Sequence, residues 1–167
     1  MTAPPLTPKY GKILPPTEPG GPSWYAIDHV VTFGETSMAG FVYYLRLIEW
    51  QGHLREMFAL ELARDYMNLM AEGRLVMLTQ SVSCEYHAEI RLGELISLRL
   101  TISWLKGIRC IGDYAYYRTV PGGEELVASG QQMWTNTDAQ GEPAPWPQCV
   151  LDACHQLNID TSQALTT

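Results

Sequence analysis

Apolar residues recur at helical spacing from about Val42 to Met70, which predicts one long amphipathic helix. The pattern is clearest up to about Leu62, and Gly73 is a candidate terminator. Before the helix, residues 24–33 read as a strand and residues 34–40 (GETSMAG) as a loop.

After the helix, apolar and polar residues alternate with a period of two, as in strands with one buried face. Val82, Cys84 and Tyr86, for example, alternate with polar residues. Four such strands are predicted, near residues 82–90, 96–104, 109–120 and 125–137. Short turns separate them, so hairpins dominate. The order of strand, helix and four strands predicts an α+β fold, with one helix packed on a strongly curved antiparallel sheet of about five strands.

The two ends of the chain differ from this periodic middle. Residues 1–22 contain seven prolines and few apolar residues. Such a composition does not offset its ordering entropy, so we expect a flexible tail. Residues 23–140 are expected to form the folded domain, and residues 141–167 a C-terminal extension with a short helix near 147–158.

Composition narrows the class of protein. With 167 residues and 46% hydrophobic residues, the chain can bury the core of one soluble domain. Its net charge of -7 and pI near 5.0 argue against nucleic acid or a membrane surface as a partner. The proline-rich N-terminus lacks the apolar run of a signal peptide, and no segment resembles a membrane span. We therefore expect a cytoplasmic protein.

Arg55 lies at the centre of the apolar face of the predicted helix. At 100° per residue, six residues fall within about 40° of it: Tyr44, Ile48, Gln51, Ala59, Leu62 and Tyr66. Other charged residues, including Arg46 and Glu49, fall on the opposite side. A buried charge costs several kcal/mol or so unless it is paired or binds an anionic ligand, so Arg55 marks a candidate site.

Three motifs carry a resemblance to a known family. They are F-x-E-T-x-x-x-G-x-V-Y-Y from Phe33, W-Q-G-x-x-R-E-M-F from Trp50, and S-C-E-Y-x-A-E-I from Ser83. Together they resemble the hotdog-fold acyl thioesterases, and most closely the subgroup that serves enediyne polyketide synthases. The resemblance covers roughly residues 25–137.

The resemblance implies a homo-oligomer, a dimer or a dimer of hotdog dimers, with active sites at the dimer interface. The implied substrate is a polyene β-ketoacyl chain on the acyl carrier protein domain of an iterative polyketide synthase. Hydrolysis would release this chain, and loss of CO2 can follow. No metal or organic cofactor is implied.

The resemblance to this subgroup implies that the principal polar groups of the site are an Asn directly after the E-T pair and an Arg on the helix. Here these positions hold Ser37 and Arg55, while Phe41 and Leu47 make the expected pocket more apolar. The expected catalytic groups are Arg55, Ser37 and the amides of Gly40, Phe41 and Val42. The expected substrate-binding residues are Glu35, Thr36, Tyr44, Leu47 and Gln51.

These groups suit thioester hydrolysis, which passes through a tetrahedral oxyanion. Backbone N–H groups at a helix N-terminus, here around Gly40 to Val42, are preorganised donors to an oxyanion. Gly40 allows close approach of the carbonyl. Arg55 would add a charged donor or orient water, and Ser37 would hold that water.

Structural explanations remain open for the same residues. Arg55 could pair with a buried carboxylate such as Glu35, and Ser37 could cap the following helix. Gly52, inside the helix, is expected to mark close packing against the sheet. Glu35 and Thr36 could brace the loop.

Alternative functions also remain. The protein could be a catalytically weak or idle accessory that binds an acyl chain, or an acyl-CoA thioesterase of other specificity. A hotdog dehydratase needs a catalytic His with an acidic partner, and the sequence shows no such motif around its four histidines: His29, His53, His87 and His155.

The cysteines and the basic residues complete the expectations. The four cysteines contain no C-x-x-C pair and are expected to be reduced and structural: Cys84, Cys110, Cys149 and Cys154. Docking of an acidic carrier protein would need a basic patch, for which there are four candidates: Arg46, Arg64, Lys106 and Arg109.

Overall fold

The computed structural model describes residues 7–164, whose six antiparallel strands form one sheet. The strands are β1 (Lys12–Leu14), β2 (Trp24–Val30), β3 (Leu75–Tyr86), β4 (Leu95–Lys106), β5 (Arg109–Val120) and β6 (Gly123–Asp138). Their order across the sheet is β1-β2-β4-β5-β6-β3. The α+β hotdog fold is thus confirmed, with six strands in place of about five because β1 was not foreseen.

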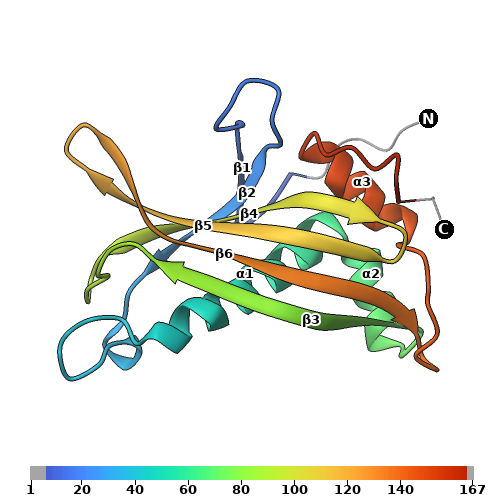
Figure 1. The fold of residues 1–167 in the computed structure, drawn as a ribbon, viewed down its shortest axis with the longest axis horizontal. Helices are drawn as coiled ribbons and strands as arrows, with labels where there is room; N and C mark the ends of the chain where they lie inside the picture. Colours follow the sequence, from blue (N-terminus) through green and yellow to red (C-terminus); the bar gives the residue numbers. More distant parts are fainter. Residues whose placement is uncertain (1–6, 165–167) are drawn as a thin grey trace.

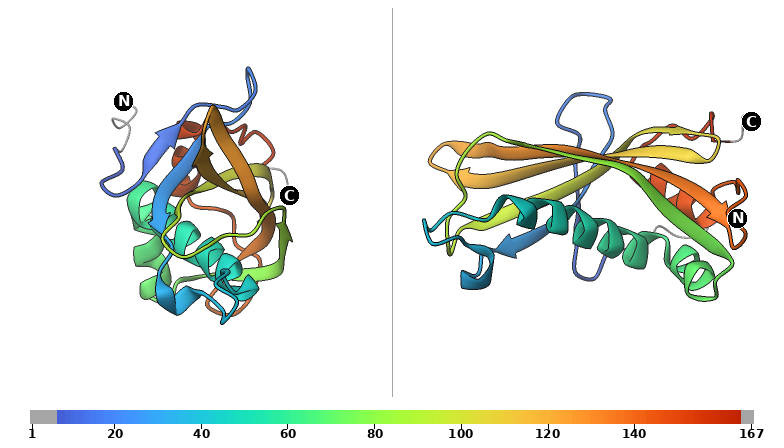
Figure 2. Two further views of the ribbon diagram at one scale, coloured as in Figure 1. Left: turned by 90° about the vertical axis from the view of Figure 1, so that its left-hand side faces the viewer. Right: turned by 60° about the horizontal axis from the view of Figure 1, so that its bottom comes forward.

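The central helix α1 (Tyr44–Leu62) runs along the inner side of the curved sheet (Figure 1, Figure 2). A second helix, α2 (Arg64–Ala71), follows after Ala63, whose backbone leaves helical geometry at φ -136° and ψ 44°. The single helix expected to Met70 is therefore two. The helix also begins later than Val42, because the Val42 amide donates to the Ile90 carbonyl in a short extended pairing.

The core lies between α1 and the sheet. In β4, alternate residues such as Leu98 and Leu100 are fully buried, as the period-two pattern predicted. β3 behaves differently. It runs from Leu75 to Tyr86, so it begins and ends earlier than the expected residues 82–90, and it lies at the edge of the sheet with only β6 as a neighbour. Several of its apolar side chains are exposed, including Leu78 (47%) and Val82 (41%).

The N-terminal segment is held by one carboxylate. Glu61 of α1 accepts hydrogen bonds from the amides of Lys9, Tyr10 and Gly11, at 2.6, 2.6 and 2.9 Å, and from the hydroxyl of Tyr25. The strand β1 then pairs with β2. The expectation of a flexible tail over residues 1–22 is therefore wrong for residues 9–14, which are bonded to the domain. Residues 1–6 lie outside the described residues.

The C-terminal extension contains α3 (Gln148–Gln156), which confirms the predicted short helix. Several of its apolar residues join the same core cluster as α1, among them Val150 and Cys154. Asn136 of β6 fixes the preceding segment, because its side-chain amide donates to the carbonyls of Ala144 and Pro145 at 3.0 and 2.9 Å. The extension therefore completes the domain core; its residues 165–167 lie outside the described part.

The glycines show where helix and sheet meet most closely. A Cβ at Gly52 would meet no atom within 4 Å, so the expected packing role of Gly52 is wrong. A Cβ at Gly130 of β6 would instead collide with the side-chain amide of Gln51 and the carbonyl of Ser83. Close approach is therefore required at Gly130.

We expect Gly130→Ala to lower the free energy of unfolding by about 1–3 kcal/mol, because the added methyl group has no space. Gly52→Ala is the matched control and should raise it by up to about 1 kcal/mol, since alanine is the better helix former. Urea denaturation monitored by circular dichroism measures both. Equal effects of the two substitutions would contradict this assignment.

Candidate active site

The loop before α1 is braced by the carboxylate of Glu35. This carboxylate accepts hydrogen bonds from the Thr32 amide and hydroxyl at 2.6 and 2.7 Å, and from the Trp50 indole at 2.8 Å. His29 Nε2 lies 2.8 Å from the same group. Glu35 therefore ties β2, the loop and α1 together, and its expected bracing role is confirmed.

Burial alone would raise the pKa of Glu35. The hydrogen bonds from Thr32 and Trp50, together with the nearby His29 imidazole, outweigh burial and lower this pKa. The carboxylate is thus ionised at neutral pH and already satisfied. It is not the partner of Arg55.

The segment from Ser37 to Val42 forms a tight turn. The Gly40 amide donates to the Ser37 carbonyl at 2.9 Å, with Gly40 at φ +82°, and the Ser37 amide donates to the Phe41 carbonyl at 2.7 Å. The Val42 amide is bound to Ile90. Of the three amides expected to hold an oxyanion, only that of Phe41 has no partner among the described residues.

This result corrects the expected position of the donors. The N-terminus of α1 is at Tyr44, so Gly40 and Val42 precede the helix and their amides are already engaged. Ser37 does not cap α1 either, because the N-cap residue is Tyr43 and no side chain caps it.

An open groove of about 380 Å³ lies beside this turn. It brings together three expected residues, Phe41, Val42 and Leu47, whereas Ser37 is not among its lining residues. The groove also contains His87 and Glu89, which sequence reasoning missed as site residues. Both residues lie within the S-C-E-Y-x-A-E-I motif, but the motif alone does not indicate that they lie beside the loop before α1.

The remaining residues expected to bind substrate have structural contacts. The carbonyls of Tyr44 and Leu47 accept hydrogen bonds from the hydroxyls of Tyr86 and Tyr116, each at 2.9 Å. The Thr36 hydroxyl donates to the Phe33 carbonyl at 3.0 Å. The two tyrosine hydrogen bonds attach the start of α1 to β3 and β5.

Arg55 faces the sheet, as its helical position predicted. One terminal guanidinium nitrogen donates to the Thr79 hydroxyl at 3.0 Å and to the Gln132 side-chain oxygen at 3.2 Å. Its Nε is buried and has no partner in the described part of the chain. No ion pair joins Arg55 to any carboxylate of residues 7–164.

Two glutamines continue this network through the core. Gln132 donates to the Gln51 side-chain oxygen at 3.1 Å and accepts from the Trp134 indole at 2.8 Å. Gln51 in turn donates to the Ser83 carbonyl at 2.9 Å. Gln51 is fully buried and engaged, so it positions Arg55 through Gln132.

The charge of Arg55 acts on two buried tyrosines. Burial raises the pKa of Tyr114 and Tyr66, and the positive charge of Arg55 opposes both shifts. The guanidinium therefore places a positive potential inside the domain. A group that carries negative charge is favoured there.

The structure does not bring the turn and Arg55 together within one chain. Arg55 lies about three helical turns after Tyr44, roughly 16 Å along the axis. The expected catalytic groups therefore fall into two sets, one at the groove and one in the middle of α1.

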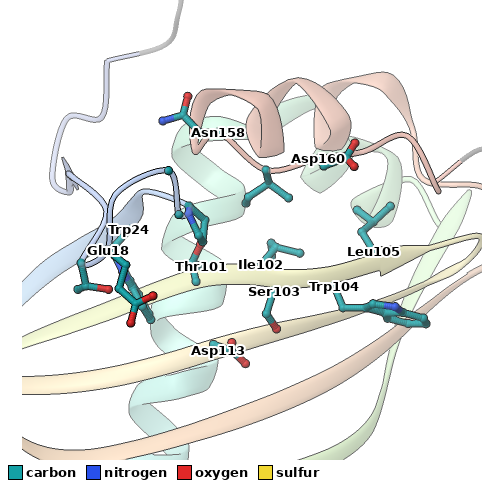
Figure 3. A pocket seen from close by; sticks show the side chains of 15 residues that line it. Glu18, Trp24, Thr101, Ile102, Ser103, Trp104, Leu105, Asp113, Asn158 and Asp160 are labelled. Carbon is teal, nitrogen blue, oxygen red and sulfur yellow. The ribbon is translucent and has the colours of Figure 1, made fainter.

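A larger hollow of about 400 Å³ lies elsewhere, between residues 17–22, β4, β5 and residues 158–160 (Figure 3). It contains three carboxylates, those of Glu18, Asp113 and Asp160, and no basic side chain. None of the expected site residues lines it. Its acidic lining does not suit the phosphate groups of coenzyme A or phosphopantetheine.

Other chemistries find little support in residues 7–164. That part contains no group of three or more His, Cys, Asp or Glu side chains able to hold a metal ion. No helix there combines the length and apolar character needed to cross a membrane. The four cysteines are free, as expected, and burial raises the pKa of the Cys84 thiol, which makes it a poor nucleophile.

Comparison with known proteins gives consistent results. Residues 31–154 match the thioesterase-like superfamily. The chain is similar to the dynemicin thioesterase, whose crystal structures show polyene binding. The two sequences are 31% identical, the match covers 80% of this chain and 96% of that chain, and the TM-score is 0.75.

Two more distant structures share the fold. The 1,4-dihydroxy-2-naphthoyl-CoA thioesterase Slr0204 from Synechocystis is 20% identical, with 82% of this chain and 99% of that chain covered and a TM-score of 0.73. A gentisyl-coenzyme A thioesterase is 21% identical, with 77% and 98% covered and a TM-score of 0.66.

One curated relative is of a different kind. The chain is 31% identical over 91 residues to Izumo sperm-egg fusion protein 1 of Mus musculus, which corresponds to 53% of this chain and 23% of that protein. The chain thus spans less than a quarter of the length of that relative.

We expect the stability of the protein to fall in acid partly through Glu35. Because the folded-state pKa of Glu35 is lowered, its contribution is present above the ordinary pKa of a glutamate and is lost as pH falls through the folded-state value. Glu35→Gln should therefore be less stable at neutral pH and lose less stability on acidification.

Thermal unfolding across an acidic pH series measures this effect, with Glu56→Gln, an exposed position on α1, as the matched control. If the wild type and Glu35→Gln gave parallel pH profiles, the proposed bracing by the ionised carboxylate would be wrong.

Proposed function

Because the chain belongs to the thioesterase-like superfamily and is a hotdog thioester hydrolase, we propose that it releases a polyene β-ketoacyl chain from a carrier protein. The carrier would be the acyl carrier protein domain of an iterative, enediyne-type polyketide synthase. The observation that carries the proposal is Arg55, a partly buried cation with no carboxylate partner among the described residues. The likeness to the dynemicin thioesterase over most of both chains supports it.

Hotdog thioesterases are typically oligomeric, and we propose that this protein dimerises through β3. This strand is long, lies at the sheet edge, and exposes apolar side chains such as Leu78 and Val82. An edge of this kind is a template for pairing with another strand. A second copy related by a two-fold axis would continue the sheet antiparallel.

Such a dimer would bring the two parts of the site closer. Within one chain, Thr79, which binds Arg55, lies about 23 Å along β3 from Tyr86, which binds the start of α1. If a two-fold axis passes near the middle of β3, the partner's Arg55 would lie closer to the loop before α1 than the Arg55 of the same chain does. The separation along β3 would be roughly halved. The site would then be completed only by the second copy.

In the proposed mechanism, water attacks the thioester carbonyl and the oxygen becomes an oxyanion. The unpaired Phe41 amide and a terminal guanidinium nitrogen of the partner's Arg55 would donate to that oxygen. Collapse of the intermediate expels the thiolate of the carrier, which takes up a proton, and leaves a carboxylic acid. Glu35 and Gln51 act only by holding the loop and Arg55 in place.

The rival is a catalytically idle hotdog protein that binds an acyl chain. The engaged amides of Gly40 and Val42, and the position of Ser37 outside the groove, favour this rival. An acyl-CoA thioesterase of other specificity is the second alternative. Substitution of Arg55 separates hydrolysis from binding.

Docking of a carrier protein and a cytoplasmic location stay predictions. Lys106 and Arg109 lie exposed at the turn between β4 and β5, and Arg64 lies exposed at the start of α2. Arg46, the fourth candidate, is paired with Glu49 at 2.6 Å. The first three are therefore the better candidates for contacts with an acidic carrier.

We expect Arg55→Ala to lower kcat on a loaded acyl carrier protein by about 100- to 1,000-fold, the loss typical of removing one oxyanion donor. Arg74→Ala, an exposed arginine in the turn before β3, is the control and should retain full activity. Mass spectrometry of the released acid and of the carrier measures turnover, and circular dichroism verifies folding. No turnover by folded wild-type protein, or full turnover by Arg55→Ala, would reject the proposal.

The dimer is tested separately. We expect the double substitution Leu78→Lys and Val82→Lys to convert a dimer into a monomer of about 18.7 kDa, because it places like charges across the paired edges. Val30→Lys, at an exposed position of β2, is the control and should stay dimeric. Sedimentation equilibrium measures the mass, and a monomeric wild type would refute pairing through β3.

A further inference from the structure

Two buried polar atoms in the middle of the domain have no hydrogen-bond partner in the described part of the chain. One is the Nε of Arg55, and the other is the hydroxyl oxygen of Tyr114 on β5, a residue that is only 1% exposed. Buried polar groups in folded proteins are nearly always bonded, so two such atoms need an explanation. They are also complementary, because the Nε–H can only donate whereas a tyrosine hydroxyl both donates and accepts.

The fold places Tyr114 beside the side chains that hold Arg55. The ring of Tyr114 packs edge-on against the ring of Trp134, with centroids 6.5 Å apart. The Trp134 indole donates to the side-chain oxygen of Gln132, and Arg55 donates to the same oxygen. Tyr114 and Arg55 therefore contact neighbouring members of one cluster on the inner face of the sheet.

The neighbours of Tyr114 on this face do not supply a partner for its hydroxyl. Leu100 and Gly130 lie opposite it on β4 and β6, and Gly112 lies two residues before it on the same strand. Tyr116, two residues after it, already donates its own hydroxyl to a carbonyl of α1 at 2.9 Å. Three of the four neighbours carry no polar side chain and the fourth is engaged, which leaves the side of the helix as the source of a partner.

The charge of Arg55 reaches Tyr114 from that side. Burial raises the pKa of Tyr114, and the positive charge of Arg55 opposes this shift. The phenol stays protonated at neutral pH and is therefore a neutral hydrogen-bonding group. It does not neutralise the guanidinium, but it is suited to fix its orientation.

We propose that Tyr114 is a positioning residue for Arg55, with one buried water that joins its hydroxyl oxygen to the Nε–H of Arg55. Such a water holds two buried polar groups nearly as well as a direct hydrogen bond. One terminal nitrogen of Arg55 is already bound to Thr79 and Gln132. Anchored at this nitrogen and at Nε, the planar guanidinium cannot rotate, and its other terminal nitrogen keeps a fixed direction. The inference rests on the proposed thioesterase function, in which a terminal nitrogen of Arg55 meets the reacting carbonyl oxygen.

The link itself is tested without turnover. The probe is the Nε–H signal of Arg55 in a nitrogen–proton correlation spectrum of the full chain, assigned by its loss in Arg55→Lys. We expect this proton to exchange slowly with solvent in the wild type, and about tenfold faster in Tyr114→Phe. Tyr25→Phe, which removes a similarly buried hydroxyl that binds Glu61, is the matched control and should leave the signal unchanged.

Hydrolysis tests the role of the link. We expect Tyr114→Phe to lower kcat about tenfold with KM unchanged, because it misplaces a catalytic group but removes no contact with the substrate. In an Arg55→Lys background, which keeps the charge but lacks the Nε–H, the same substitution should change kcat by less than about twofold. Tyr25→Phe should lower the unfolding temperature and leave kcat unchanged, since its hydroxyl acts only on stability.

An equal loss of kcat in both backgrounds would indicate a general effect on structure and overturn the inference. An Nε–H signal that Tyr114→Phe leaves unchanged would do the same, as would a crystal structure in which the two atoms are bonded to separate groups. The outcomes distinguish the two proposals. A signal that depends on Tyr114 without hydrolysis by wild type rejects the thioesterase mechanism alone, whereas hydrolysis with an unchanged signal rejects the link alone.

Discussion

The internal hydrogen-bond network from Arg55 through Gln132 to Gln51 is the constraint on which the rest of the structure depends. It places a charge and two amides where an apolar core would otherwise lie. Buried polar groups are tolerated only when they are bonded, so the network fixes the position of α1 relative to β3 and β6. Gly130 lacks a side chain because Gln51 occupies the space that one would need.

The fold could be predicted largely because it depends on local patterns. The bounds of β5 agree with the expected residues 109–120, and the alternation in β4 correctly identified its buried face up to Ile102. Beyond it a bulge turns Trp104 outward and Leu105 inward, so the expected burial of Trp104 is wrong. The break at Ala63 could not be predicted, since apolar spacing continues through it into α2. β1 was missed because it is held by pairing with β2, and the residues just before it are bound by Glu61, a carboxylate far away in the sequence.

The site was predictable only in part, for a similar reason. Helical geometry alone turned Arg55 toward the sheet. Its partners, Thr79 and Gln132, depend on the register of two strands, which no local pattern reports. The same holds for the Gly40 and Val42 amides. The first is engaged within its own turn, and the second donates to the Ile90 carbonyl in the connection between β3 and β4.

The C-terminal segment and the loop at the groove lie at opposite ends of α1. Trp146 and Val150 come from the C-terminal end and meet α1 and α2 near Phe58 and Tyr66, whereas Phe41 contacts the opposite end of α1. Two segments far apart in the sequence therefore cover the two ends of α1. Because Trp146 and Val150 are buried, loss of the C-terminal segment would expose apolar surface of α1 and α2 to water and make the domain prone to aggregation.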